Sequence, residues 1–181
     1  MAAILRNLPS RKEPDEVVVG RERVAIKPYQ IIAWFSLTAR NVVDLPPQAP
    51  RFPAILDIGH NHNFSIQERH LVEWARLPAD GLPSIRQIRE RNRLVPLCAA
   101  NVWIHPNVAE KRDKLSADPP FLLHLDQGIA IYPSELDFPR LPLLGLRGLV
   151  RNHLHLMVDP ERCLVNLCTP DWRTSVLRWF F

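Results

Sequence analysis

The sequence has few cysteines and no long apolar run. Its three cysteines, Cys98, Cys163 and Cys168, are an odd number without CxxC spacing, which argues against a disulfide framework or a zinc ribbon. No window approaches the roughly 18 uninterrupted apolar residues of a membrane-spanning helix, and the N-terminus lacks the apolar core of a secretory signal. We therefore expect a cytoplasmic protein with no membrane partner.

Glycine is also scarce, whereas proline is abundant. The 181 residues include 6 glycines and 18 prolines. Proline removes a backbone donor and stiffens extended segments, so this ratio argues against long helices and suits a mostly β fold. The chain is long enough to bury its own core as one domain, and its 46% hydrophobic and 23% charged residues are typical of a globular protein.

Several motifs and charge patterns are missing. The sequence contains no Gly-rich phosphate loop, no Gly-x-Ser-x-Gly elbow and no HExxH, so we expect no cofactor. The net charge of +4 comes from 23 basic and 19 acidic residues spread along the chain. Only residues 86–93 are locally basic, and such a run is more often a solvated face than a nucleic-acid site. We expect no nucleic-acid partner.

One stretch combines an apolar run with a loop that carries a carboxylate. Residues 52–56 are apolar, Asp57 and Gly59 follow, and an alternating apolar pattern resumes at Phe64 and Ile66. This pattern predicts a strand, a tight loop and a second strand. Glycine permits backbone angles and a close approach that a side chain forbids, so the loop can hold the carboxylate rigidly. An Asp beside Gly, taken alone, is more often a turn former.

A second segment, later in the chain, joins an apolar run to a glycine. The run ends at Leu144 and Gly145, and a short helix is predicted over residues 145–152 because apolar residues there share one face. These residues are Leu146, Leu149 and Val150. A strand is expected to follow at residues 154–158.

Together, the two segments resemble those of the retropepsins, the single-domain aspartic proteases. In that family an Asp-Thr/Ser-Gly loop is followed by an apolar-apolar-Gly segment that opens a short helix, and the two segments pack together behind the catalytic loop. The resemblance covers roughly residues 24–167 and implies an acid-protease fold, a closed β-barrel with the short helix. It implies that Asp57 is catalytic and that Gly59 shapes its loop. The residues implied to support the loop or the interface are Ile58, His60, Asn61, Leu144 and Gly145.

The chemistry implied by this resemblance needs two carboxylates. Two carboxylates that share one proton can activate a water between them, because like charges so close together cannot both ionise. The sequence has one such loop, so the resemblance implies an isologous homodimer in which each subunit supplies Asp57. The implied activity is that of an aspartic endopeptidase acting on a peptide or protein substrate.

The loop departs from the family at Ile58, where the family has Thr or Ser. In the family that hydroxyl hydrogen-bonds the partner loop, whereas isoleucine has no donor. Losing such a bond costs on the order of 1 kcal/mol, and a misplaced dyad lowers the rate. The alternative function is therefore a catalytically impaired retropepsin-fold dimer that binds peptides or serves assembly. Two compensations stay open: Ile58 packs into the interface, or His60 or Asn61 supplies the missing hydrogen bonds.

A weaker interpretation concerns metal. His60 and His62 are spaced to chelate, with Asp57 or His70 as a third ligand, and imidazole and carboxylate are ordinary zinc ligands. No fourth ligand is evident in the sequence, so we expect no metal.

Residues 85–90 and 94–104 are predicted to be the arms of a hairpin. In retropepsins this position carries the flap, the hairpin that closes over bound peptide. The tip here is charged and lacks glycine, and the residues implied to cover substrate are Glu90, Arg91, Asn92 and Arg93.

The remaining expectations concern boundaries. Ser65 and Glu68 form a capping-box pattern, which predicts a helix over residues 66–76. We expect three parts in the chain: a flexible N-terminal arm (1–16), the retropepsin-like domain (17–168) and an aromatic C-terminal tail (169–181). The resemblance implies the dimer interface as one place for the tail, and packing on its own subunit is the other.

Overall fold

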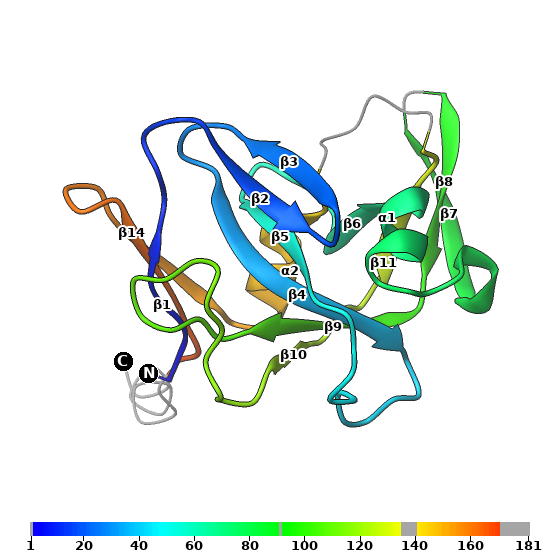
Figure 1. Ribbon diagram of the computed structural model, residues 1–181. Helices are drawn as coiled ribbons and strands as arrows, with labels where there is room; N and C mark the ends of the chain where they lie inside the picture. The colour runs from blue at the N-terminus through cyan, green and yellow to red at the C-terminus, as the bar shows by residue number, and fades with distance from the viewer. Residues whose placement is uncertain (1, 91, 135–140, 171–181) are drawn as a thin grey trace, which may run out of the picture.

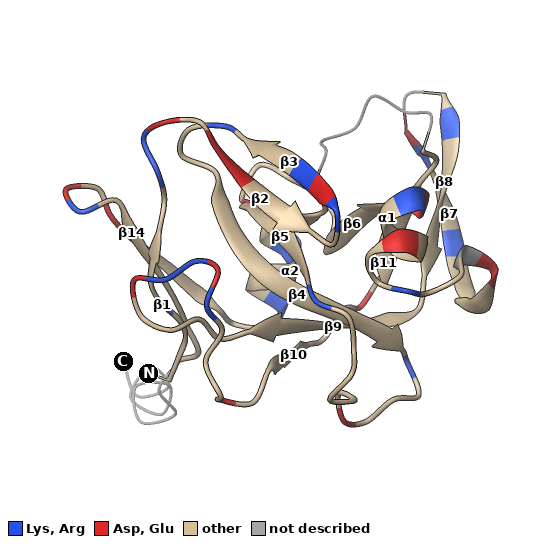
Figure 2. Ribbon diagram, viewed as in Figure 1, with Lys and Arg blue, Asp and Glu red and all other residues tan. Residues whose placement is uncertain are grey.

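The structure is a computed structural model, which describes residues 2–90, 92–134 and 141–170 (Figure 1). This part of the chain is mostly β, with fourteen strands and two short α-helices, which confirms the expected fold class. Proline-rich connections separate the strands, and charged residues of both signs are spread over the loops and hairpins (Figure 2). Neither of the described helices has the length and apolar character needed to cross a bilayer.

Nine strands form the main sheet. In spatial order they are β10 (Phe121–Leu123), β9 (Ala100–His105), β4 (Ile31–Ala39), β5 (Phe52–Asp57), β12 (Leu143–Gly145), β6 (Phe64–Gln67), β11 (Ile129–Tyr132), β8 (Arg93–Cys98) and β7 (Ser84–Glu90). Among the described strands, this sheet ends at β10 and β7 and does not close on itself. The closed barrel expected from the sequence is therefore not what the described residues form.

The centre of the main sheet is formed by segments that are far apart in the sequence. Strand β12 lies between β5 and β6, parallel to the first and antiparallel to the second. The apolar runs of these strands are buried on both sides, and three fully buried rings pack there, with centroids of Phe64 5.6 Å from Phe35 and 6.5 Å from Phe52. Burial of whole aromatic side chains stabilises this part of the fold strongly.

Two smaller sheets complete the structure. The hairpin of β2 (Asp15–Val19) and β3 (Glu22–Ile26) turns at Gly20, whose φ of 60° favours glycine, and β2 contacts β5. The other sheet has the order β1 (Ala3–Pro9), β14 (Leu164–Cys168) and β13 (His155–Asp159).

The N-terminal segment differs from the expectation of a flexible arm over residues 1–16. Residues 3–9 form β1, which pairs antiparallel with β14 and buries Leu5 and Leu8. Residues 2–8 are mostly apolar and residues 10–16 mostly polar, but no local pattern reveals that the partner strand lies at the other end of the chain. The aromatic tail expected at residues 169–181 lies, from residue 171 onward, outside the described residues.

The helices also correct the sequence-based boundaries. Ser65, expected as a helix cap, is a fully buried residue of β6, and helix α1 (Glu68–Glu73) begins after Gln67 with no side-chain cap. The capping-box pattern failed because β6 pairs with both β11 and β12, and these ladders favour strand over helix at Ser65. A single 3₁₀ turn, η1 (Ala79–Gly81), follows. Helix α2 (Leu146–Arg151) lies where the short helix was predicted.

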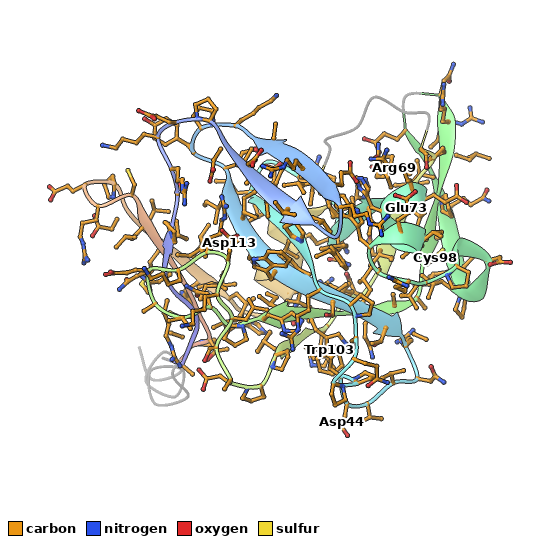
Figure 3. All side chains as sticks on the ribbon, viewed as in Figure 1. Asp44, Arg69, Glu73, Cys98, Trp103 and Asp113 are labelled. Carbon is orange, nitrogen blue, oxygen red and sulfur yellow. The ribbon has the colours of Figure 1, made fainter. Side chains whose placement is uncertain are left out.

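A buried arginine orders the long loop between β9 and β10. Arg112 is paired with Asp15 at 2.5 Å and with Asp113 at 2.8 Å, and it donates to the carbonyl oxygen of Glu16. Two carboxylates compensate the buried guanidinium, and Asp113 lies beside the β1 and β4 region in Figure 3. This contact ties the loop to the β2–β3 hairpin.

Candidate functional site

Asp57 lies at the carboxyl end of β5, where the chain turns away from the sheet. Its side-chain oxygen Oδ1 accepts a hydrogen bond from the Gly59 backbone N–H at 2.9 Å, and its carbonyl accepts one from the His60 N–H at 3.1 Å. These two bonds close a tight turn and fix the carboxylate. The side chain is partly buried, so the loop holds an acid that a ligand can reach.

Gly145 of β12 packs against the backbone of this loop. It pairs in register with Asp57 across β12 and β5, its N–H donates to the Asn63 carbonyl, and the Leu146 N–H donates to the His60 carbonyl. A Cβ at position 145 would lie 2.1 Å from the His62 carbonyl oxygen, so only glycine fits. The two segments singled out in the sequence therefore pack together as expected.

Gly59 has a different role from the one expected. Its φ lies outside the left-handed region. Among the described glycines, Gly20 and Gly128 are the ones with a positive φ. A Cβ at position 59 would meet only the Asp57 side chain, at 3.3 Å. The residue contributes through its N–H, which bonds the carboxylate, and the close approach predicted for Gly59 belongs instead to Gly145.

His60 and His62 follow the turn, and each has its own partner. The His60 Nε2 atom lies 2.5 Å from the Ser65 hydroxyl, and the His62 Nε2 atom lies 3.5 Å from the Glu90 carboxylate. The two rings touch edge to face, with centroids 5.3 Å apart. Burial, and then the neighbouring His62, lower the pKa of His60. His60 thus uses Nε2 to brace its own loop.

A metal site at His60 and His62 would need a third ligand. In the part of the chain that the structure describes, no three His, Cys, Asp or Glu side chains are grouped so as to hold a metal ion. His70, the third ligand considered from sequence, is buried elsewhere and stacks on Trp74 with ring centroids 3.7 Å apart. The spacing of His60 and His62 instead places one ring toward Ser65 and the other toward Glu90.

The hairpin predicted near residue 91 is present as β7 and β8. Glu90 and Arg93 face each other across its end, and Arg91 lies outside the described residues. Asn92 adopts φ 64°, the left-handed conformation that Asn tolerates better than most residues, so glycine is not needed at this position. The second predicted arm, 94–104, is two strands, because the extended structure is interrupted at Ala99, between β8 and β9.

A cavity of about 790 Å³ borders Asp57. Asp57 is the single acid of its lining and Lys27 the single base, and most other lining residues are apolar. The principal ones are Ile26, Tyr29, Ile31, Ile55, Leu141 and Leu143. A cavity with this lining suits an extended ligand that carries both apolar and polar groups. Sequence reasoning missed it, because its walls come from β3, β5, β12 and the β3–β4 connection.

Exposed apolar side chains flank the same loop. Ile58 is 62% exposed, and Leu146 and Val150, one turn apart on α2, are 46% and 61% exposed. The helix begins beside the loop, since the Leu146 N–H bonds the His60 carbonyl. Leu144, by contrast, is fully buried, whereas Asn61 is exposed. Exposed apolar patches mark interaction sites in many proteins, and these three side chains are a candidate for one.

Asp126 fixes the other side of the loop. Its carboxylate accepts hydrogen bonds from Asn63 at 2.9 Å and from Arg147 at 2.7 Å, and it pairs with Arg151 at 3.0 Å. The Arg147 hydrogen bond is the main reason that the pKa of Asp126 lies well below its usual value. These contacts join the loop, the β10–β11 turn and α2 into one unit.

Comparisons with known protein families, with curated proteins and with solved structures gave no match for this chain. Function is therefore inferred from the geometry around Asp57.

Proposed function

We propose that this chain is one half of an aspartic endopeptidase with a retropepsin-like fold. In the active dimer the Asp57 carboxylates of two copies face each other across a two-fold axis. They share one proton and activate a water that attacks the peptide carbonyl carbon. The protonated carboxyl donates to the carbonyl oxygen, while the ionised one accepts the proton of the water.

The observation that carries this proposal is the fixed carboxylate of Asp57 at the wall of the cavity. Its loop is closed by the Gly59 N–H and supported by Gly145 at a distance that admits no side chain. An acid that only ends a turn needs neither that support nor a cavity beside it. An acid held in place at the wall of an open cavity is an arrangement that suits general acid–base catalysis.

The exposed apolar patch supports the pairing of two copies. Ile58, Leu146 and Val150 flank the Asp57 loop and are each close to half exposed or more. A two-fold contact through this patch would bury apolar surface and bring the two loops together. Because the catalytic chemistry needs a second carboxylate, the site is complete only with that second copy.

A second function is favoured by Ile58. This residue cannot donate the hydrogen bond that the retropepsin hydroxyl makes, and the His60 Nε2 atom is already engaged with Ser65. In this alternative the dimer forms through the same patch, and the cavity binds a peptide without cleaving it.

The replacement Asp57→Asn tests the proposal. An unstructured protein incubated with the wild-type chain between pH 4 and 7 should be cleaved, and the replacement should lower the rate by about 100-fold or more, because the amide cannot accept the proton of water. Asp44→Asn is the matched control, since Asp44 is an exposed acid on the β4–β5 connection (Figure 3).

The outcomes separate the two functions. Equal cleavage by Asp57→Asn and Asp44→Asn rules out the dyad. Absence of cleavage by wild type, with cleavage in Ile58→Thr, supports the peptide-binding alternative and identifies its cause. If neither the wild type nor Ile58→Thr cleaves the protein and neither binds a peptide, both proposed functions are contradicted.

A further inference from the structure

A second cavity, of about 370 Å³, lies between the β2–β3 hairpin and helix α1. Its walls come from the turn of the hairpin, from the residues just before β5 and from the end of α1. Arg69 of α1 donates to the Glu22 carboxylate of β3 at 3.1 Å, and this contact joins the helix to the hairpin (Figure 3). The cavity shares no lining residue with the cavity at Asp57, so the two are separate places in the fold.

Each of the three wall segments carries one arginine to this cavity. These residues are Arg21, Arg51 and Arg76. In the part of the chain that the structure describes, none of the three has an ion-pair partner, whereas Arg69 is paired with Glu22. A cavity lined by charges of one sign concentrates the electrostatic potential and attracts an ion of the opposite sign. The three guanidinium groups therefore favour a bound anion.

The backbone at these three positions is ordered by local contacts. Arg21 lies in the turn between Val19 and Glu22, which pair across the hairpin. The buried Ser36 hydroxyl donates to the carbonyl oxygen of the residue before Arg51 at 2.7 Å. Arg76 adopts φ 57°, the left-handed conformation in which the chain leaves α1. The fold thus brings three arginines from distant parts of the sequence to one place.

Trp74 supplies the apolar part of the wall. Its side chain is 6% exposed, and its indole stacks on the buried His70 ring with centroids 3.7 Å apart. This stacking fixes the indole at the cavity. The volume of about 370 Å³ exceeds what a bare inorganic anion fills. It leaves room beside Trp74 for an organic group attached to the anion.

The charge of the lining selects among anions. The lining also contains Glu22, which Arg69 neutralises, and Glu73, which has no ion-pair partner among the described residues. With three unpaired arginines, two positive charges remain to be compensated. A phosphate monoester carries about two negative charges at pH 7, whereas a carboxylate carries one. Guanidinium groups also match the oxygen spacing of phosphate in bidentate hydrogen bonds.

We propose that this cavity is a binding site for a phosphate monoester. Arg21, Arg51 and Arg76 hold the phosphate, and Trp74 lies beside the organic group. A free small molecule and a phosphorylated side chain share this chemistry. The site does not depend on Asp57 or on the function proposed above.

The test is calorimetric titration of the full chain at pH 7.5 with phenyl phosphate, and with benzoate as the singly charged analogue. Phenyl phosphate should bind at one site per chain, at least about tenfold more tightly than benzoate, because it carries the second charge. Lowering the pH to 5 protonates the phosphate, whose second pKa is about 6. Its affinity should then fall toward that of benzoate.

Four replacements locate the site. Arg21→Gln and Arg51→Gln should each raise the Kd at least about tenfold, because each removes a charge-assisted hydrogen bond. Arg89→Gln, at an exposed position of β7, is their control. Glu73→Gln removes a like charge and should lower the Kd about threefold. Its control is Asp44→Asn, an exposed acid on the same β4–β5 connection as Arg51 but outside the lining (Figure 3).

Equal affinities for phenyl phosphate and benzoate overturn the site, as do equal effects of Arg51→Gln and Arg89→Gln. Absence of phenyl phosphate binding up to about 10 mM also overturns it. A phosphoserine peptide that binds at least about tenfold more tightly than phenyl phosphate assigns the site to a phosphorylated protein segment. Tighter binding of phenyl phosphate assigns it to a free phosphate monoester, and both of these results support the site. None of these measurements uses peptide cleavage, so the proposed function and the phosphate site stand or fall separately.

Discussion

The strands around Asp57 and the β7–β8 hairpin both carry residues that the sequence singled out, but they are held in different ways. The first region has β12 inserted between β5 and β6, fully buried rings and a glycine in backbone contact. The second is largely exposed, is tied at its tip by the contact of Glu90 with Tyr132, and rests on a small cluster that lies apart from the main core and comprises Val95, Leu97, Ala130 and Tyr132. This difference indicates a rigid support for the carboxylate beside a hairpin that is held more weakly.

The largest contrast in stability is expected between Phe64 and Ile88. Phe64→Ala removes a fully buried ring in contact with Phe35 and Phe52 and should cost about 4 kcal/mol of unfolding free energy. Ile88→Ala removes a half-buried side chain over the small cluster and should cost about 1 kcal/mol. Urea denaturation of both variants measures this, and equal losses would remove the distinction between the two regions.

Acid should weaken the main body before it affects the hairpin. Burial lowers the pKa of His70 and of His105 to about 4, so the unfolded chain binds protons more readily between pH 6.5 and 4. Stability should fall over that window, on the order of 2 kcal/mol for each histidine. The contribution of Glu90, whose pKa is lowered, is lost only at more acid pH. Stability that is flat from pH 7 to 5 in urea titrations would contradict this.

Within the Asp57 region, Gly145 and Gly59 should differ in how well they tolerate a side chain. Gly145→Ala places a Cβ against backbone carbonyls and should cost about 2 kcal/mol. Gly59→Ala meets only the Asp57 side chain and should stay within about 0.5 kcal/mol. Thermal or urea unfolding of the two variants measures this difference in stability. A Gly145→Ala protein as stable as Gly59→Ala would refute the close packing of β12 against the loop.

The smallest effect on monomer stability is expected at the apolar patch. Leu146→Arg changes an exposed side chain, so the unfolding free energy of the monomer should change by no more than about 0.5 kcal/mol. It places like charges in a two-fold contact and should raise the dimer Kd at least about tenfold. Sedimentation measures this. Val43→Arg, at an 81% exposed position, is the control, and equal behaviour of the two would place the interface elsewhere.

The sequence was most informative where the signal is local. The strand ending at Asp57, the short helix after Gly145 and the hairpin near Glu90 are all present, because apolar periodicity and glycine placement act over a few residues. The packing of Gly145 against the Asp57 loop could also be anticipated, from a resemblance to retropepsins in two short segments. The fold and function implied by that resemblance stay predictions.

The rest depends on contacts between distant residues. Ser65 reads locally as a helix cap, yet the ladders with β11 and β12 place it in a strand. Strand β1 needs a partner near the other end of the chain, and the contact of Glu90 with Tyr132 joins residues 42 positions apart. The cavity beside Asp57 is likewise assembled from several strands. Single-sequence patterns carry none of this information.

Mixing subunits shows whether two Asp57 carboxylates form one active site. Wild-type and Asp57→Asn chains are combined in equal amounts, allowed to exchange and assayed for peptide cleavage at constant total chain concentration. If each site needs Asp57 from both copies, activity should fall to about one quarter of that of wild type alone, because only that share of dimers is fully wild type. Activity of about one half, or no cleavage by the wild type itself, would rule out an active site shared by two Asp57 residues.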